Sequence, residues 1–157
     1  MNQTAFIQTP IGIAKITADD AGVSEISITN EGTISTKIPH ELIEAATQLQ
    51  DYFLGKRINF NLKLNPKGTV FQQKVWGELQ KIPFGKTISY LELAKKLGDP
   101  KVIRAAASAN GKNPLLILIP CHRVIGTSGE LTGFSGGLWR KKWLLELENP
   151  SIQQVLF

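Results

Sequence analysis

The sequence contains very little cysteine and histidine. Cys121 is the single cysteine, and His40 and His122 are the only two histidines among 157 residues. A lone cysteine excludes an internal disulfide bond and fits a reducing compartment, so we expect the protein in the cytoplasm, or in the nucleus if the source is eukaryotic. So few soft ligands also argue against a structural zinc site, and we expect no bound metal.

Long apolar runs and targeting signals are also missing. No uninterrupted apolar run approaches the ~18 residues that a membrane-spanning helix needs. Residues 1–4 lack the basic region and the apolar stretch of a signal peptide. With 42% hydrophobic and 20% charged residues, the chain has the composition of a soluble protein with one or two cores, and we expect no membrane partner. No glycine-rich nucleotide loop is visible, so we expect no cofactor.

Charge is distributed unevenly along the chain. Residues 1–64 contain five Lys/Arg and seven Asp/Glu, a net charge of −2, whereas residues 65–157 contain thirteen and six, a net charge of +7. The basic half is the half that contains the cysteine. Lysine and arginine side chains that face phosphates release counterions and hold a nucleic acid before any base is read. The asymmetry therefore favours a polyanionic partner over a merely solubilising surface.

The first half has the pattern of a small sheet followed by a helix. Runs rich in β-branched residues at 5–9, 11–17 and 23–28 predict a β-meander. Apolar residues then follow helical spacing over 40–54, and those at 58–64 alternate as in a strand. This half shows no pattern of chemistry. We expect a scaffold domain over residues 1–64, followed by a linker.

Capping signals divide the second half into helices. Thr69-Val70-Phe71-Gln72 and Ser89-Tyr90-Leu91-Glu92 both have the spacing of a capping box, and Asp99-Pro100 is a typical helix start. Helices are expected at residues 69–81, 89–98, 99–109 and 138–147. The second and third have the dimensions of a helix-turn-helix. The fold class predicted for the whole chain is α+β, with a mainly helical domain over residues 69–157.

The cysteine follows a short, strongly apolar run. Residues 115–119 are all apolar and lie between two prolines, which predicts a strand covered on both faces, although periodicity alone also allows a buried helical turn. Pro120 ends the run and holds Cys121 just beyond a rigid element. A thiol needs a base or a positive neighbour to become a thiolate nucleophile. His122 and Arg123 follow directly, but neighbours on extended backbone point to opposite sides, so His122 would act through a water or a tight bend. The alternative is that Cys121 is a small buried hydrophobic residue and His122 a surface residue.

One stretch resembles a known family. Pro120-Cys121-His122-Arg123-Val124 is preceded by Asn113-Pro114 and followed by Gly133-Phe134-Ser135-Gly136-Gly137-Leu138. This pattern resembles the active-site signature of the O6-alkylguanine-DNA alkyltransferases, and the resemblance extends over roughly residues 69–148. It implies a ribonuclease-H-like N-terminal domain over residues 1–64 and a C-terminal alkyltransferase and DNA-binding domain over residues 69–157.

The resemblance also implies a catalytic relay. Glu148 would hold His122, and His122 would deprotonate Cys121 through a water. The thiolate would then attack the alkyl carbon on O6 of guanine. Without the resemblance, the sequence could equally nominate Glu130 or Glu146 as the carboxylate that orients the histidine.

Further residues are assigned roles by the same resemblance. Tyr90 would hydrogen-bond the N3 edge of the guanine and Lys141 would assist it, although Lys141 also has the pattern of a solvent-facing residue in the basic run 140–142. The substrate-binding residues implied are Asn113, Val124, Phe134 and Ser135. Asn113 would brace the cysteine turn, and the carbonyl of Val124 would accept from the guanine amino group. Phe134 stands where many members have tyrosine, and Ser135 would lie next to O6. Ser135 could also be only a turn residue.

DNA binding is expected from the helix pair. Residues 105–109 are small, so that only Lys101 and Arg104 can reach far from the second helix. The resemblance implies that Arg104 occupies the space of a nucleotide extruded from the duplex, and that the protein enters by the minor groove. We expect Lys101, Arg104, Tyr90 and Arg123 to contact the DNA. Reading the backbone and weakened pairing suits a lesion that can lie in any sequence.

These observations predict a DNA repair protein that works once. It would move a methyl or larger alkyl group from O6-alkylguanine, and also from O4-alkylthymine, to Cys121, acting as a monomer on double-stranded DNA. The thioether product has no carbonyl for water to attack, so the protein would stay alkylated. The alternatives are a Cys-His-Glu acyl hydrolase and a non-catalytic helix-turn-helix regulator. The prediction also requires a cavity beside the sulfur that is wide enough for a purine.

Overall fold

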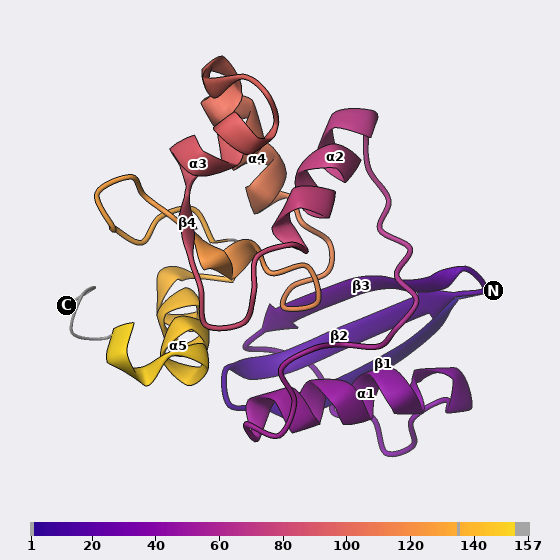
Figure 1. Cartoon of the computed structure of the whole chain (residues 1–157). Coiled ribbons are helices and arrows are strands. Elements are labelled where there is room, and N and C mark those ends of the chain that lie inside the picture. The colour runs from indigo at the N-terminus through magenta and orange to yellow at the C-terminus, as the bar shows by residue number, and fades with distance from the viewer. Residues whose placement is uncertain (1, 135, 153–157) are drawn as a thin grey trace. The chain divides into compact units, whose positions relative to one another are not determined.

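The structure is a computed structural model, described here over residues 2–134 and 136–152 (Figure 1). The chain divides into two compact units, Met1–Lys67 with Pro114–Leu116, and Gly68–Asn113 with Ile117–Phe157. The described residues form a three-stranded antiparallel sheet, a two-stranded parallel sheet and five α-helices. The predicted α+β class is confirmed. No helix in these residues has the length and the apolar content needed to cross a membrane.

The first unit contains the predicted β-meander and helix. Strands β1 (Gln3–Thr9), β2 (Gly12–Asp19) and β3 (Gly22–Thr29) pair in sequence order, and α1 (His40–Phe53) packs against β1 and β2. Burial alternates along the strands, as expected for a sheet with one covered face. Gly22 has a φ of 139°, and a Cβ there would lie 2.5 Å from the Lys63 carbonyl oxygen, so this turn needs glycine.

The strand predicted at residues 58–64 is wrong. Ile58 is exposed, and the segment pairs with β3 only at its end, where Val23 donates to the Lys63 carbonyl and Asn65 donates to the Val23 carbonyl. Further back, the Gln48 side chain takes the place of a partner strand. Its amide oxygen accepts from the Asn61 N–H at 2.9 Å and its amide nitrogen donates to the Asn61 carbonyl at 3.1 Å.

The strand predicted at residues 115–119 is also wrong, although the whole run is buried. Leu115 forms a single parallel bridge with Ile26 of β3. The chain then turns at Ile117, which has a φ of 77°, a conformation rare for a β-branched residue. Beyond the turn, the Asn113 side-chain amide donates to the Ile119 carbonyl at 2.7 Å. The apolar run therefore fills the interior as an irregular segment whose polar groups are satisfied by a side chain as well as by backbone.

The second unit contains four α-helices. They are α2 (Val70–Leu79), α3 (Tyr90–Lys96), α4 (Ile103–Gly111) and α5 (Leu138–Glu148). Both predicted capping boxes are confirmed, at Thr69 and at Ser89. Asp99 also caps as predicted, but the element that it opens is a short 3₁₀ helix (Pro100–Val102) that leads into α4.

Short elements and one indole complete this unit. Strands β4 (Ile88–Ser89) and β5 (Val124–Ile125) pair in parallel, and 3₁₀ turns lie at Cys121–Arg123 and Pro150–Ile152. The buried Trp76 ring of α2 donates from Nε1 to the Ala109 carbonyl of α4 at 2.9 Å. Small alanines on α4 allow this close packing. Strand β4 directly precedes α3 and pairs with β5, which directly follows the turn that carries the cysteine.

Candidate active site

Cys121 is the first residue of the 3₁₀ turn that follows Pro120. The residue is only 3% exposed, and its N–H donates to the Ile119 carbonyl at 2.8 Å. Burial raises the pKa of the Cys121 thiol to about 11, while a hydrogen bond from Asn113 and the positive charge of Lys141 act in the opposite direction. The resting side chain at neutral pH is therefore a thiol, which must lose its proton to react.

His122 and Glu148 lie in direct contact. His122 Nε2 and Glu148 Oε2 are 2.6 Å apart, and neither side chain is more than 1% exposed. An ionised carboxylate can only accept, so Nε2 carries the proton. His122 Nδ1 is buried and has no hydrogen-bond partner among the described residues, which leaves its lone pair free to act as a base. Burial lowers the pKa of His122 against the opposing charge of Glu148, and we take the ring as neutral.

The structure selects one of the three possible carboxylates. Glu130 is exposed and Glu146 is half-buried, whereas Glu148, at the end of α5, lies against the histidine. Burial alone would raise the pKa of Glu148, but His122 and Arg123 together hold it below its usual range. Glu148 is therefore ionised throughout the neutral pH range.

Arg123 lies elsewhere than predicted. Arg123 is 6% exposed, and its Nε and Nη2 donate to the two Glu148 carboxylate oxygens at 2.7 and 3.0 Å. Nη1 donates to the Ile82 carbonyl at 2.7 Å. The expected contact with DNA is corrected, because a guanidinium buried in three such bonds cannot reach a phosphate. The tight 3₁₀ turn, in place of extended backbone, brings both His122 and Arg123 onto one carboxylate.

Lys141 is buried in α5 and lies on the same helical face as Glu148, seven residues later. Its side chain is fully covered, and Nζ donates to the carbonyls of Val124 and Thr132 at 2.5 and 2.7 Å. Burial lowers the pKa of Lys141 to about 8, while the nearby Cys121 acts to raise it. The solvent-facing alternative for this lysine is therefore wrong.

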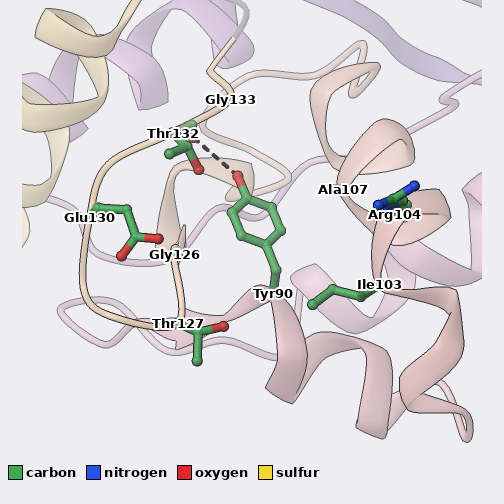
Figure 2. Close-up of a pocket in the computed structure, with 9 residues that line it drawn as sticks. All are labelled: Tyr90, Ile103, Arg104, Ala107, Gly126, Thr127, Glu130, Thr132 and Gly133. Atoms are coloured by element: carbon green, nitrogen blue, oxygen red, sulfur yellow. Dashed lines mark hydrogen bonds between the residues drawn. The ribbon is translucent and has the colours of Figure 1, made fainter.

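Tyr90 connects the site to a cavity. It is the first residue of α3, and its hydroxyl donates to the Thr132 carbonyl at 3.1 Å. Figure 2 shows the ring between the loop that contains Glu130 and the helix that contains Arg104. The cavity there has a volume of about 340 Å³, of the size of small-ligand sites. It is lined by Tyr90, Ile103, Arg104, Ala107, Gly126, Thr127, Glu130, Thr132 and Gly133.

The cavity does not meet the expectation in full. Cys121 is not among the residues that line it, and the sulfur is buried. Tyr90 lines the cavity and is close enough to Cys121 for the two groups to interact electrostatically. The carbonyl of Thr132, another residue of the lining, accepts from both Tyr90 and Lys141. A cavity of about 340 Å³ is present, but Cys121 does not line it.

Comparisons with known proteins identify the family of the chain. The family model described as "6-O-methylguanine DNA methyltransferase, DNA binding domain" matches residues 70–150. The methylated-DNA–protein-cysteine methyltransferase of Methanosarcina acetivorans is 41% identical over 92% of this chain and 96% of its own length. The chain belongs to the methylated-DNA–protein-cysteine methyltransferase family.

Solved structures show the same similarity. The O6-methylguanine methyltransferase of Mycobacterium tuberculosis superposes with a TM-score of 0.86 at 40% identity, covering 96% of this chain and 94% of that one. A crystal structure of the Mycobacterium tuberculosis protein in complex with DNA superposes with a TM-score of 0.83, also at 40% identity, covering 95% and 92%.

Within this methyltransferase, the other residues predicted for the site are distributed as follows. Asn113, Val124 and Phe134 are buried, whereas Lys101 and Arg104 are exposed on or before α4. Ser135 lies outside the described residues. The Val124 carbonyl, expected to accept from guanine, accepts from Lys141. Groups of His, Cys, Asp or Glu that could hold a metal do not occur in the described residues.

Three residues of the site were missed by the sequence analysis. Buried Asn110 donates to the Cys121 carbonyl at 3.4 Å, and Thr132 contributes its carbonyl to two donors. Gly133 has a φ of 64°, and a Cβ there would lie 3.1 Å from the Tyr90 hydroxyl. An asparagine after a run of small helical residues is a usable signal for Asn110. A backbone acceptor such as that of Thr132 leaves no signal in the sequence.

Proposed function

We propose that this protein repairs DNA by moving a methyl or larger alkyl group from O6 of guanine to the sulfur of Cys121, once per molecule. The observation that carries the proposal is the buried His122–Glu148 pair, whose imidazole keeps an unpartnered Nδ1 lone pair and directly follows the single, buried cysteine in the chain. The relatives in the family are named for the same chemistry. O4-alkylthymine is the second substrate that we propose.

The reaction begins with the thiol proton. His122 Nδ1 accepts it through a water, while Nε2–H stays bonded to ionised Glu148. The thiolate attacks the alkyl carbon, a carbon–sulfur bond forms, and the bond from that carbon to O6 breaks. The electron pair leaves with O6 into the guanine ring. The product is a thioether on Cys121, which has no leaving group that water could displace.

The guanine anion needs a proton donor. Burial raises the pKa of Tyr90, so its hydroxyl stays protonated and can donate to guanine N3. Lys141, fixed by two carbonyls, stabilises the thiolate and supports Tyr90, over whose ring its ammonium lies at 5.7 Å from the centroid. Asn113 braces the cysteine turn, and Val124, Phe134 and Ser135 bind the base.

The hydrogen bond of Tyr90 implies a rearrangement on binding. The Tyr90 hydroxyl cannot donate to guanine while it donates to the Thr132 carbonyl. The extruded base therefore replaces the Thr132 carbonyl as the acceptor for the Tyr90 hydroxyl.

DNA binding is assigned to α3 and α4. These helices contact each other and have the arrangement that we propose as a helix-turn-helix. Exposed Lys101 contacts the backbone, and Arg104, which lines the cavity, fills the space of the extruded nucleotide from the minor groove. The protein acts as a monomer, and the first unit is a ribonuclease-H-like scaffold.

The test is a stoichiometric assay with a duplex oligonucleotide that contains one O6-methylguanine. We expect the protein mass to rise by one methyl group, located on Cys121 by peptide analysis, with one lesion removed per molecule. Cys121→Ala with the same duplex, and native protein with unmethylated duplex, are the controls. Lasting turnover of an ester or amide, with no modification of the protein, would instead support the acyl hydrolase.

A further inference from the structure

The Glu148 carboxylate is shared by two cationic or potentially cationic side chains. Arg123 binds both of its oxygens, at 2.7 and 3.0 Å, and His122 binds one of them at 2.6 Å. The guanidinium is itself held in place by the Ile82 carbonyl and lies 5.8 Å from the centroid of the Phe84 ring. This arginine fork is a fixed part of the site, because three separate groups define its plane.

Sharing one carboxylate has a consequence for the histidine. A buried carboxylate with a single neutral partner would favour the imidazolium ion, which has no lone pair for the thiol proton. Arg123 remains charged at every relevant pH, so it already compensates the charge of Glu148. The charged groups that face His122 are Glu148 and Lys141, both on α5, and Arg123 on its own turn. Only Glu148 favours the protonated ring.

We infer that Arg123 is a positioning residue that keeps His122 neutral by binding Glu148, so that Nδ1 can accept the thiol proton of Cys121. The inference rests on the proposed function for its purpose, but its electrostatic content concerns the resting protein alone. It also gives Arg123 a role in place of the DNA contact expected from the sequence. The planar fork matters, because a lysine at this position would supply the charge without binding both carboxylate oxygens.

The first test needs no variant. The chain has two histidines, and His40 in the first unit is exposed, so it serves as an internal reference in a histidine-labelled NMR titration. In the native protein we expect His122 to carry its proton on Nε2 and to stay neutral well below the ordinary histidine pKa of about 6.5. A His122 ring that titrates at or above that value would overturn the inference.

The second test removes the guanidinium. In Arg123→Gln we expect the pKa of His122 to rise by about one pH unit or more, the range typical of a nearby charge. Arg123→Lys should show a smaller rise, and the His40 signal is the internal reference in every protein. The matched control is Arg140→Gln, which removes another buried arginine of the second unit, one that donates to the Gly136 carbonyl. It should leave His122 unchanged.

Methyl transfer provides an independent readout. The acid limb of the pH–rate profile should move to higher pH in Arg123→Gln, by the same amount as the His122 titration. A slower reaction with an unmoved profile and an unmoved His122 titration would mean that Arg123 only supports the fold. If the NMR result holds but native protein transfers no methyl group, the proposed function fails and the inference about His122 stands.

Discussion

At the scale of single residues, Cys121 and Lys141 form a buried pair in which each charge depends on the other. Burial raises the pKa of Cys121 to about 11 and lowers that of Lys141 to about 8. At pH 7 the pair is a thiol beside an ammonium ion. Deprotonation by His122 creates a thiolate next to that ammonium, which is a favourable interaction in a site of low dielectric. Lys141 thus stabilises the reactive form of the cysteine and not its resting form.

Lys141→Met tests this pair. The change leaves the carbonyls of Val124 and Thr132 without their ammonium donor, so we expect a loss of about 2 kcal/mol in the free energy of unfolding. It also removes the positive charge near the thiol, so the pKa of Cys121 should rise further and methyl transfer should slow. Urea unfolding and the pH dependence of alkylation by a thiol reagent measure the two effects. The neighbouring half-buried Lys142, changed to Met, is the control, and an equal effect there would contradict the assignment.

Sequence patterns identified the reacting residues better than their charged neighbours. Cys121 and His122 lie in a specific motif, Glu148 was implied by the family resemblance, and the structure brings the histidine and this carboxylate together. Arg123 was assigned to DNA, and Lys141 was predicted to assist Tyr90 or to face solvent, because charged side chains are rarely buried unless they are paired. Their partners are carbonyls and a carboxylate from distant parts of the chain, and no local pattern encodes such partners.

At the scale of elements, two helices begin with the same chemistry. The side chains of Thr69 and Ser89 each accept from the backbone N–H of the third residue of their helix. In turn, the side chains of Gln72 and Glu92 accept from the backbone N–H of Thr69 and Ser89. A lost cap of this kind costs about 1 kcal/mol. The two helices differ in function, because Ser89 directly precedes Tyr90 whereas α2 carries no residue that we place at the site.

We therefore expect Thr69→Ala and Ser89→Ala to lose similar stability, about 1 kcal/mol each in urea unfolding. Only Ser89→Ala should also slow methyl transfer, since fraying of the first turn of α3 moves the Tyr90 hydroxyl. Rates measured with the same methylated duplex, at a temperature where both variants are folded, make the comparison. Equal rates in the two variants would show that Tyr90 is positioned by its packing and not by the cap.

Local signals account for the elements that were predicted correctly. Helix caps and helical periodicity act within a few residues, and α1 to α5 follow them. The predictions of strands at residues 58–64 and 115–119 were wrong because a strand needs a partner strand, and the sequence of a segment does not identify its partner. At both places an amide side chain, Gln48 or Asn113, supplies hydrogen bonds that a neighbouring strand would otherwise make.

At the scale of the whole molecule, the uneven charge governs DNA binding. The net charge of +7 lies in residues 65–157, which include the exposed Lys101. Each phosphate contact contributes about 0.9 to the slope of log affinity against log salt. We expect Lys101→Gln to weaken binding equally for all duplex sequences and to reduce that slope by about one. Lys37→Gln, in the acidic half, is the charge-matched control, and a slope unchanged by Lys101→Gln would remove this lysine from the interface.

Acid stability depends on the same histidine that serves as the base. The pKa of His122 is lowered in the folded protein, so the unfolded chain binds this proton first, at a pKa of about 6.5. The free energy of unfolding should therefore fall as the pH drops below about 6.5, and Glu148, whose pKa is also lowered, should add a further loss at more acid pH.

The three tryptophans, Trp76, Trp139 and Trp143, all lie in the second unit, so their fluorescence in urea follows the unit that contains the site. We expect the urea midpoint to fall between pH 7.5 and 5.5 in native protein and in His40→Gln, but to change much less in His122→Gln. An equally steep fall in His122→Gln would mean that the acid sensitivity arises elsewhere and that His122 is not held neutral by the fold.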